Sequence, residues 1–385
     1  MTVYALHRRG AHAARWLATV DEAYAEMARL IDAAVHSVRL ETYLLREQGP
    51  AVALREALLR ARTRGVAVWV LLDAFGSEGV HREFLAPLGE AGAAVAHFNP
   101  QRLLRRSFRN HRKLLACDGG HAIVGGFNVG PEYAGDGVTH GWCDTGVYLA
   151  GPVVHQLEAS FDAMFRLAPF TPPALNHFRR IVRRGLAPVP HEDAPVQLLL
   201  AGPGTRGRLL RHRLGADLAR AHDVAIASAY FLPSRGFRRL LYRAAWRGQA
   251  RLLLTGRSDV PVARLAAERL YGRLLTRGVR IFEYQPQILH AKLVLADDVA
   301  WVGSANLDWR SLHINYELLL RFRWPELVAD ARRWYEQALG EAEQLHYSGW
   351  RARRGQWRRV LSWLAYWLLA RLDPLVARRG ARSIH

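Results

Sequence analysis

The chain has 385 residues, of which 50% are apolar and 23% are charged, and its formal net charge is +20. This is the composition of a globular protein, and it excludes disordered and fibrous classes. The length predicts about two domains, each able to bury its own core. Two cysteines, Cys117 and Cys143, cannot form a disulfide framework. Because there is no signal-peptide core and no apolar window of about 18 residues, we expect neither secretion nor a membrane span.

The first predicted elements lie between Val38 and Ser77. An apolar strand ends near Tyr43, an amphipathic helix follows, and an Arg-Gly turn at Gly65 leads into another strand. A second helix and the strand-like segment AVAHFNP come next. This alternation of strand and helix predicts an α/β lobe.

A basic loop, QRLLRRSFRN, follows at residues 101–110, whereas its counterpart later in the chain, QPQIL, has no arginine. The mixture of arginine with leucine and phenylalanine predicts either contact with an anionic surface or head group, or an ordinary solvated loop. The arginines concerned are Arg102, Arg105, Arg106 and Arg109.

Two short motifs hold the only lysines of the chain. Of the 54 lysine and arginine residues, Lys113 and Lys292 are lysine and the other 52 are arginine. This bias marks two positions where arginine does not serve, because lysine is a compact point charge and arginine a wide planar fork. Each lysine stands in the pattern H-x-K-x4-D followed by G-[GS]-x-N. The first copy comprises His111, Lys113, Asp118 and Asn128, and the second comprises His290, Lys292, Asp297 and Asn306.

The spacing within each motif has a structural meaning. The apolar runs LLAC and LVLA after the lysines predict buried strands. Since alternate residues of a strand share a face, each histidine projects together with its lysine. Glycines in the next strand allow close backbone approach, so that each asparagine can return to the same pocket.

The two motif aspartates fall where these strands end. There an aspartate can make the turn or take part in catalysis, and we rank the turn role of Asp118 and Asp297 above direct catalysis. The connecting turn is one residue shorter in the second copy. Either the turn alone is shorter, or the register changes and moves Asn306.

The surrounding elements also occur twice. The segment from Val224 to Asp259 repeats the strand, helix and strand of the first half, with Gly248 in the Arg-Gly turn. The chain therefore predicts two α/β lobes related by duplication. We divide it into an N-terminal lobe (1–167), a Pro/Arg-rich linker (168–195), a C-terminal lobe (196–345) and a basic, Trp-rich tail (346–385).

If the two motifs face each other, one cleft holds two imidazoles, two ammonium groups and two carboxamides. These donors suit the non-bridging oxygens of a phosphodiester, whose charge grows in the transition state. One neutral imidazole would attack phosphorus while the other, protonated, gives its proton to the leaving alcohol, which forms a covalent phosphohistidine. The lysines supply the positive charge, so no metal or other cofactor is expected.

The duplicated motif resembles the HKD motif of the phospholipase D superfamily. From about Leu17 to Trp334 the chain is similar to bacterial cardiolipin synthases, especially the B type, and the similarity includes HRKLLACDGGHAIVGGFNVGPEY and HAKLVLADDVAWVGSANLDWRSL. The resemblance implies two similar lobes of mixed sheets flanked by helices, with the active site at their pseudo-twofold interface. It also implies transfer of a phosphatidyl group between phosphatidylglycerol molecules with release of glycerol.

The same resemblance implies roles for particular residues. His111 would be the nucleophile and His290 the general acid, although the residues alone leave that order open. An acid downstream would orient each histidine: Glu317 fits the second half, and Asp144 is the match in the first.

The C-terminal segment from Trp350 to His385 contains nine arginines and one acid. Its apolar run, Val360–Ala370, is too short to cross a bilayer. A basic, Trp-rich helix of this kind lies in the interface of an anionic membrane, the interpretation that we favour, or docks on the second lobe. The interfacial residues would be Trp357, Trp363 and Trp367.

The sequence thus predicts a peripheral enzyme on the cytoplasmic face of the cell membrane, whose partners are phosphatidylglycerol and the membrane surface. Alternatives with the same chemistry are a phospholipase D-type hydrolase and a synthase that uses phosphatidylethanolamine or glycerol. A related nuclease would explain the charge but not the tail, so no nucleic-acid partner is expected. A non-catalytic binding protein would not need a histidine beside each lysine.

Overall fold

The structure is a computed structural model that describes residues 3–100, 108–171, 173–177, 194–203, 206–352 and 354–372. Most of the predicted linker lies outside the described residues, and so do Arg102, Arg105 and Arg106.

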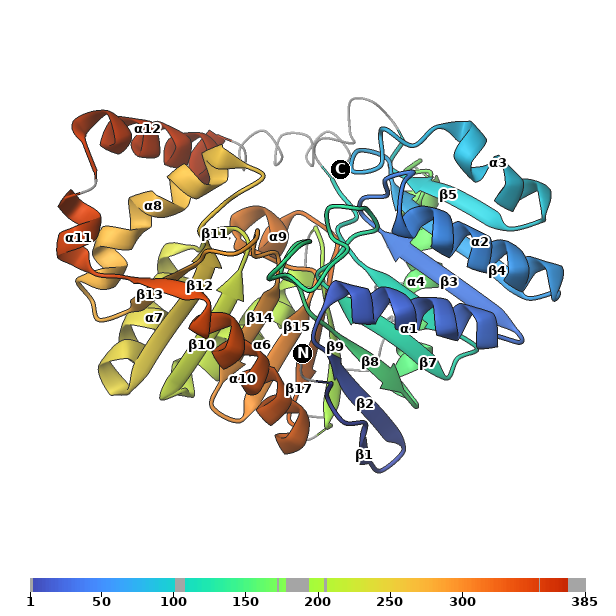
Figure 1. Cartoon of the computed structure of the whole chain (residues 1–385), viewed down its shortest axis with the longest axis horizontal. Helices are drawn as coiled ribbons and strands as arrows, with labels where there is room; N and C mark the ends of the chain where they lie inside the picture. The colour runs from blue at the N-terminus through green and yellow to red at the C-terminus, as the bar shows by residue number, and fades with distance from the viewer. Residues whose placement is uncertain are drawn as a thin grey trace.

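The first half of the chain forms a mixed eight-stranded sheet in the order β1-β2-β8-β7-β6-β3-β4-β5 (Figure 1). Its strands are β1 (His7–Arg9), β2 (His12–Leu17), β3 (Ser37–Thr42), β4 (Ala67–Asp73), β5 (Ala94–Phe98), β6 (Leu114–Cys117), β7 (His121–Gly125) and β8 (Gly146–Ala150). The helices of this half are α1 (Val20–Ala33), α2 (Pro50–Thr63), α3 (Arg82–Glu90) and α4 (Val153–Leu167).

The second half forms another eight-stranded sheet, in the order β18-β13-β12-β10-β14-β15-β17-β9, and a small two-stranded sheet of β11 and β16. Its strands are β9 (Val196–Ala201), β10 (Asp223–Ser228), β11 (Phe231–Leu232), β12 (Gln249–Thr255), β13 (Arg280–Tyr284), β14 (Lys292–Ala296), β15 (Val299–Gly303), β16 (Leu307–Asp308), β17 (Glu317–Phe322) and β18 (Ala342–Leu345). Its helices are α6 (Arg206–Arg220), α7 (Arg235–Arg247), α8 (Pro261–Leu275), α9 (Trp309–His313), α10 (Pro325–Gly340), α11 (Tyr347–Ala352), α12 (Gln356–Trp367) and the π-helix η1 (Leu368–Leu372).

The two large sheets repeat one topology. In the first, β3 pairs in parallel with β4 and antiparallel with β6, and β10 pairs in the same way with β12 and β14. Each sheet then continues through a hairpin, β6–β7 or β14–β15, to an antiparallel strand, β8 or β17. This repetition confirms the predicted fold class of two similar α/β lobes with mixed sheets.

The shorter turn of the second motif leaves the strand register unchanged. The first hairpin pairs Leu114 with Val124, and the second pairs Leu293 with Val302. In both hairpins the residue after the lysine therefore faces the residue before the motif glycine. The second motif is therefore shorter only in its turn, and Asn306 follows its strand in the same register as Asn128.

Local sequence explains where the first helix begins. Thr19 Oγ1 accepts the backbone N–H of Glu22, and the Glu22 carboxylate accepts the N–H of Ala18. Thr19 therefore caps the helix by satisfying one backbone donor of its first turn, and Glu22 holds the residue before the cap. This cap stabilises the start of α1, which packs against the outer face of the first sheet.

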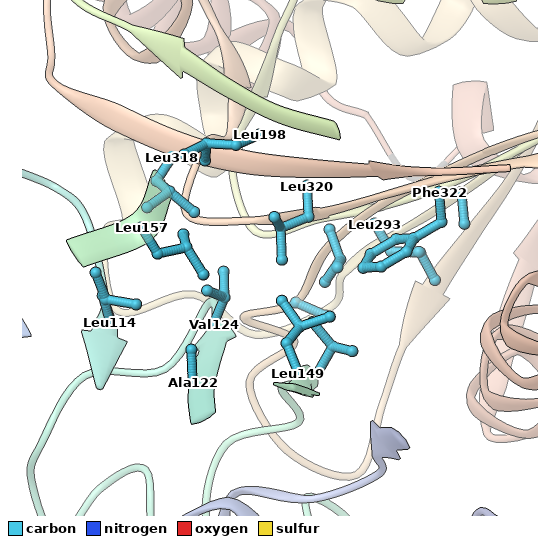
Figure 2. Close-up of a cluster of buried hydrophobic side chains, with 14 of the residues drawn as sticks. Leu114, Ala122, Val124, Leu149, Leu157, Leu198, Leu293, Leu318, Leu320 and Phe322 are labelled. Carbon is cyan, nitrogen blue, oxygen red and sulfur yellow. The ribbon is translucent and has the colours of Figure 1, made fainter. Parts of the chain in front are cut away.

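The inner faces of the two sheets meet in a common apolar core. Figure 2 shows side chains of β6, β7 and β8 directed toward side chains of β17 and its neighbours. Helices α4 and α10 contribute to the same cluster, whereas α1–α3 and α6–α8 cover separate clusters on the outer faces. Because the shared core is continuous, it fixes one lobe against the other. Among its members are Leu114, Ala122, Val124, Leu149, Leu318, Leu320 and Phe322.

The C-terminal helix α12 docks on α8 (Figure 1). Ser362 and Ala365 are buried in this contact, and the Arg358 guanidinium makes two hydrogen bonds to the Glu268 carboxylate, at 2.6 and 3.0 Å. The structure thus shows α12 docked on the second lobe, the alternative to a helix lying in the membrane interface. The remaining surface of α12 stays open, with Trp357 81% exposed and Trp363 and Trp367 about half exposed. No helix in the described part of the chain is long and apolar enough to cross a membrane.

Candidate active site

A cleft of about 690 Å³ lies between the two lobes, where the two motifs meet. His111 and Asn128 line it from the first half, and His290 and Asn306 line it from the second. The structure therefore brings both histidines and both asparagines of the predicted site to one cavity. The shared apolar core beneath the cleft holds the two sides in place.

The orienting acid of His111 comes from the opposite lobe. His111 Nδ1 lies 3.0 Å from Glu317 Oε2, and Glu317, at the start of β17, is fully buried. Glu317 Oε2 also accepts a hydrogen bond from the Ser304 hydroxyl at 2.5 Å. The backbone N–H of His111 donates to the carbonyl of Tyr316, the residue before this acid, at 2.9 Å.

His290 has the equivalent arrangement, with its acid supplied by the first lobe. Its Nδ1 lies 2.6 Å from Oδ2 of Asp144, which precedes β8 of the first lobe. The backbone N–H of His290 donates to the carbonyl of Cys143, the residue before that acid, at 2.7 Å. Each histidine is therefore held by one side-chain and one backbone hydrogen bond to the other lobe.

This crossing corrects the predicted pairing. We expected Glu317 to serve the second-half histidine and Asp144 the first-half histidine. The structure exchanges the partners, because the strands that carry the acids face the opposite motif across the lobe interface. Neither lobe alone contains a complete histidine–acid pair in this arrangement.

Both lysines lie behind the histidines rather than on the cleft wall. Each is 3% exposed. Lys113 Nζ donates to the carbonyl of His111 at 2.6 Å, and Lys292 Nζ donates to the carbonyl of His290. Lys292 Nζ also lies 3.8 Å from Asp144 Oδ2. A guanidinium is wider and holds its donors in a rigid plane, so these sites favour the narrow ammonium group of lysine.

The two asparagines differ in their contacts. Asn128 Nδ2 donates to the Tyr133 hydroxyl at 2.7 Å, and Asn128 Oδ1 accepts the backbone N–H of Leu44. Asn306 Oδ1 is buried without a hydrogen-bond partner among the described residues. An unpaired buried polar atom costs free energy. Since Asn306 lines the cleft, this oxygen is a candidate contact for a donor group of a bound ligand.

Aromatic rings enclose both histidines. Tyr43 packs edge-on against His111 at 4.9 Å between ring centroids, and Lys113 Nζ lies 5.2 Å from the same tyrosine ring. Tyr133 and Trp142 lie 5.1 and 5.3 Å from His290. These rings exclude water from the imidazoles, which strengthens every electrostatic interaction in the site.

The motif aspartates do not reach the cleft. Asp118 accepts the backbone N–H groups of Val35, His36 and Ser37, and Asp297 accepts those of His222 and Asp223. Both residues have positive φ angles, 55° and 48°, the left-handed conformation that aspartate tolerates in turns. These contacts fit the turn role that we ranked first rather than the catalytic role that we also considered: the aspartates tie each hairpin turn to the strand beside it.

Arg109 is the one arginine of the basic loop that falls within the described residues. It lines the cleft, with its guanidinium 4.2 Å from the centroid of the Phe75 ring. Its backbone carbonyl accepts the N–H of Tyr316 at 2.9 Å, beside the hydrogen bond of His111. The residue therefore belongs to the cleft and to the connection between the lobes.

The protonation states of the two pairs differ. Burial and then the charge of Lys292 lower the pKa of His290 to about 4. Burial opposes ionisation of Asp144, but the charge of Lys292 and the hydrogen bond from His290 outweigh it and lower the pKa of Asp144. At neutral pH these shifts favour a neutral imidazole beside a carboxylate.

The pKa of the acid in the His111–Glu317 pair is shifted in the opposite direction. Burial raises the pKa of Glu317 to about 8, although the charge of Lys113 opposes that shift. Burial, followed by the charges of Lys113 and Lys292, lowers the pKa of His111 well below its ordinary value. The carboxyl group of Glu317 is therefore shifted toward its protonated form, whereas that of Asp144 is shifted toward its ionised form. The two pairs thus differ in their tendency to hold a proton, a difference that acid–base assistance requires.

Three supporting residues were missed from the sequence. Ser304 and Asn315 donate to the Glu317 carboxylate, and a Cβ atom at Gly126 would lie 2.4 Å from Asp144 Oδ1. Ser304 and Gly126 occupy the same variable position of the G-[GS]-x-N pattern. The sequence could have indicated this difference: Ser304 donates a hydrogen bond to Glu317, whereas Gly126 leaves room for Asp144.

Metal ligation has no candidate cluster in the described ranges, where no three His, Cys, Asp or Glu side chains group around a common point. The cleft wall instead offers imidazole and amide groups, and the buried ammonium groups of the two lysines lie behind it, an arrangement that suits an anion.

The sequence matches the family described as "Cardiolipin synthase, PLD-like domain" over residues 27–165 and 216–339. The chain belongs to this family. It is 29% identical over 343 residues to cardiolipin synthase 1 of Bacillus cereus, covering 86% of this chain and 67% of the relative. It is 33% identical over 310 residues to a cardiolipin synthase of Geobacillus thermodenitrificans, covering 77% of this chain and 60% of the relative.

A solved structure, that of phosphatidylserine synthase from Haemophilus influenzae, has the same fold. Its TM-score is 0.72 at 13% identity, covering 97% of this chain and 96% of that one. Together with the family match, this identifies the chain as a phosphatidyltransferase of the phospholipase D superfamily. The relatives' names do not carry the B-type distinction, which stays a prediction.

The crossed pairing predicts coupling between the lobes. In a double-mutant cycle on the free energy of unfolding, His111→Gln and Glu317→Gln should couple by about 0.5–3 kcal/mol, because they remove one buried interaction. The same-lobe pair, His111→Gln with Asp144→Asn, is the matched control and should be additive to within about 0.5 kcal/mol. Urea denaturation measures both cycles. Coupling of the same-lobe pair alone would contradict the crossed arrangement.

The pKa shifts predict an alkaline limit on activity. Burial lowers the pKa of Lys292 to about 8, so its ammonium loses its charge as pH rises through that value. Glu317 becomes negative over the same range. Both changes make the cleft less positive, and kcat/KM for an anionic phosphodiester should fall above about pH 8. A profile that stays flat to about pH 10, the range of an ordinary lysine, would contradict these shifts.

Proposed function

We propose that the protein is a cardiolipin synthase that transfers a phosphatidyl group from one phosphatidylglycerol molecule to another and releases glycerol. The observation that supports this most is the pair of crossed histidine–acid units facing one cleft. The names of its relatives point to the same product. A phospholipase D-type hydrolase, or a synthase using phosphatidylethanolamine or glycerol, would use the same residues.

In the first step, one imidazole attacks the phosphorus of the donor lipid. A P–N bond forms, the P–O bond to the head-group glycerol breaks, and the proton of the other histidine–acid pair passes to the leaving oxygen. In the second step, a hydroxyl of the acceptor attacks phosphorus and gives its proton to that second pair. The P–N bond then breaks, so the enzyme returns to its starting state.

The order of the two histidines is open to direct test. The resemblance assigns the nucleophile to His111, whereas the lowered pKa of His290 favours its neutral form and the raised pKa of Glu317 favours a proton on the His111–Glu317 pair. A phosphodiester between the two pairs stabilises a proton on either imidazole. Peptide mapping of an acid-quenched reaction identifies the nucleophile by which histidine peptide carries the phosphatidyl mass.

Positive charge would come from the lysines, and the asparagine amides would add hydrogen-bonding groups. Lys113 and Lys292 each lie directly behind a histidine, and the asparagines lie on the cleft wall. A preorganised set of donors stabilises charge on the non-bridging oxygens without reorganising during the reaction. Asp118 and Asp297 have no part in this proposal beyond holding the hairpin turns.

We also place the enzyme at the cytoplasmic face of the cell membrane as a peripheral protein. The open surface of α12 presents tryptophans beside Leu361 and Leu364, and Arg351, Arg354 and Arg359 lie nearby in the chain. Leu369 and Ala370, which follow α12, line the cleft. A bilayer that received this surface would lie next to the entrance through which lipid substrates must pass.

Products distinguish the candidate reactions. Purified protein incubated with phosphatidylglycerol vesicles should yield cardiolipin and glycerol, identified by mass spectrometry. His111→Ala or His290→Ala should lower the rate by about 10²–10⁴-fold, because each removes nucleophilic or acid–base catalysis. His140→Ala, an exposed histidine outside the cleft, is the matched control and should keep wild-type activity.

Other products would replace the proposal with one of its alternatives. Phosphatidic acid with glycerol would indicate a hydrolase. Cardiolipin formed only after phosphatidylethanolamine is added would identify a different second substrate. Unchanged turnover in both active-site histidine variants would contradict the mechanism.

Membrane contact through α12 predicts a specific loss of binding. Trp357→Ala combined with Trp363→Ala should weaken flotation with phosphatidylglycerol vesicles by about tenfold, because two interfacial side chains are lost. Trp246→Ala, on α7 and 87% exposed, is the matched control and should bind normally. Equal loss in both variants, or in neither, would argue against α12 as the membrane surface.

A further inference from the structure

A second cavity, of about 270 Å³, lies between α7 and α8. It is lined by four arginines and one tyrosine: Arg235, Arg238, Arg239, Tyr242 and Arg273. Within the described ranges, no acidic side chain lines it. None of these residues lines the cleft with the histidines, so the two cavities are separate.

Arg238 is the informative member of this cluster. The residue is only 8% exposed, and its buried Nε has no hydrogen-bond partner in the part of the chain that the structure describes. Among the described residues, no carboxylate forms an ion pair with any of the four guanidinium groups. Burying a cation without a partner costs several kcal/mol, and buried charges are therefore paired or bind a ligand. A buried, unpaired arginine facing a cavity lined by other arginines is the expected appearance of an anion site.

The position of the cluster on α7 supports this interpretation. The helix begins after Ser234, whose hydroxyl accepts the N–H of Phe237, and its first turn contains no acid. Arginines at the start of a helix oppose the helix dipole, whose N-terminal end is positive. The arrangement in α7 is unfavourable by itself and becomes favourable when an anion is present.

We propose that this cavity binds a phosphate group, either as free phosphate or a soluble phosphate ester, or as a lipid head group. Guanidinium forks match the oxygen spacing of phosphate and form paired, charge-assisted hydrogen bonds. Arg238 would provide the buried contact, and Arg235, Arg239 and Arg273 the contacts nearer the opening. The Tyr242 hydroxyl is available as an additional donor.

Bound phosphate would connect α7 to α8. Since α8 carries α12 on another face, the anion would stabilise the support of the C-terminal helix. The proposal does not depend on the reaction assigned to the main cleft.

The test uses the full-length protein and inorganic phosphate as the probe. The melting temperature is followed while phosphate is added, with chloride at matched ionic strength as the reference. Arg238→Gln is compared with Arg243→Gln, an exposed arginine on the same helix that does not line the cavity. The main cleft is intact in both variants, so any phosphate that binds there contributes equally.

Phosphate should raise the melting temperature of the wild type and of Arg243→Gln. In Arg238→Gln the phosphate concentration for half the effect should rise by about tenfold or more. Without phosphate, Arg238→Gln should be at least as stable as the wild type, because it removes an unpaired buried charge. A loss of stability without phosphate, together with an unchanged response to phosphate, would overturn the proposal and show that Arg238 is only structural.

A second arm identifies the source of the phosphate. Flotation with phosphatidylglycerol vesicles that falls for Arg238→Gln but not for Arg243→Gln supports a lipid head group. A response to inorganic phosphate with equal flotation supports a soluble phosphate or phosphate ester. Equal behaviour of the two variants in both experiments would overturn the site.

Discussion

The site depends on two backbone hydrogen bonds that cross between the lobes. The N–H of His111 donates to the carbonyl before Glu317, and the N–H of His290 donates to the carbonyl before Asp144. Each bond places a histidine beside the acid of the other lobe, so the side-chain pairs at 3.0 and 2.6 Å follow from the backbone. Removing water from a histidine–carboxylate pair is costly unless its geometry is fixed, and the crossed backbone bonds fix it.

The apolar core between the sheets makes these bonds possible. Leu318 and Leu320 lie on β17 directly after Glu317, and Leu114 follows Lys113 on β6. The segments that carry the histidines, lysines and acids lead into β6, β8, β14 and β17, whose side chains join the lobes (Figure 2). Because cores are closely packed, a shift of one lobe would disturb the core and both histidine–acid pairs together. Packing of the interface therefore also positions the site.

Much of this was accessible from the sequence, because the information was local. The H-x-K spacing, the apolar runs and the glycines predicted paired strands, and their repetition predicted two similar lobes. The acids Glu317 and Asp144 were found, but their partners were exchanged. Both acids lie downstream of a motif in their own half, and only the packing of one sheet on the other decides which histidine each one meets. The same reasoning applies to α12: an amphipathic pattern predicts an apolar face but not that Ser362 and Ala365 would be the residues buried on α8.

The division of basic residues into two lysines and 52 arginines gains a physical explanation from the fold. Lys113 and Lys292 occupy buried positions where one ammonium contacts a histidine carbonyl behind the reacting groups. Burial also lowers their pKa, which brings Lys292 to about 8 and makes it sensitive to the charge of its surroundings. An arginine would keep its charge at any working pH and would need room for a planar fork. Arginine is instead used where a fork is suitable: in the ion pair that holds α12 and around the cavity at Arg238.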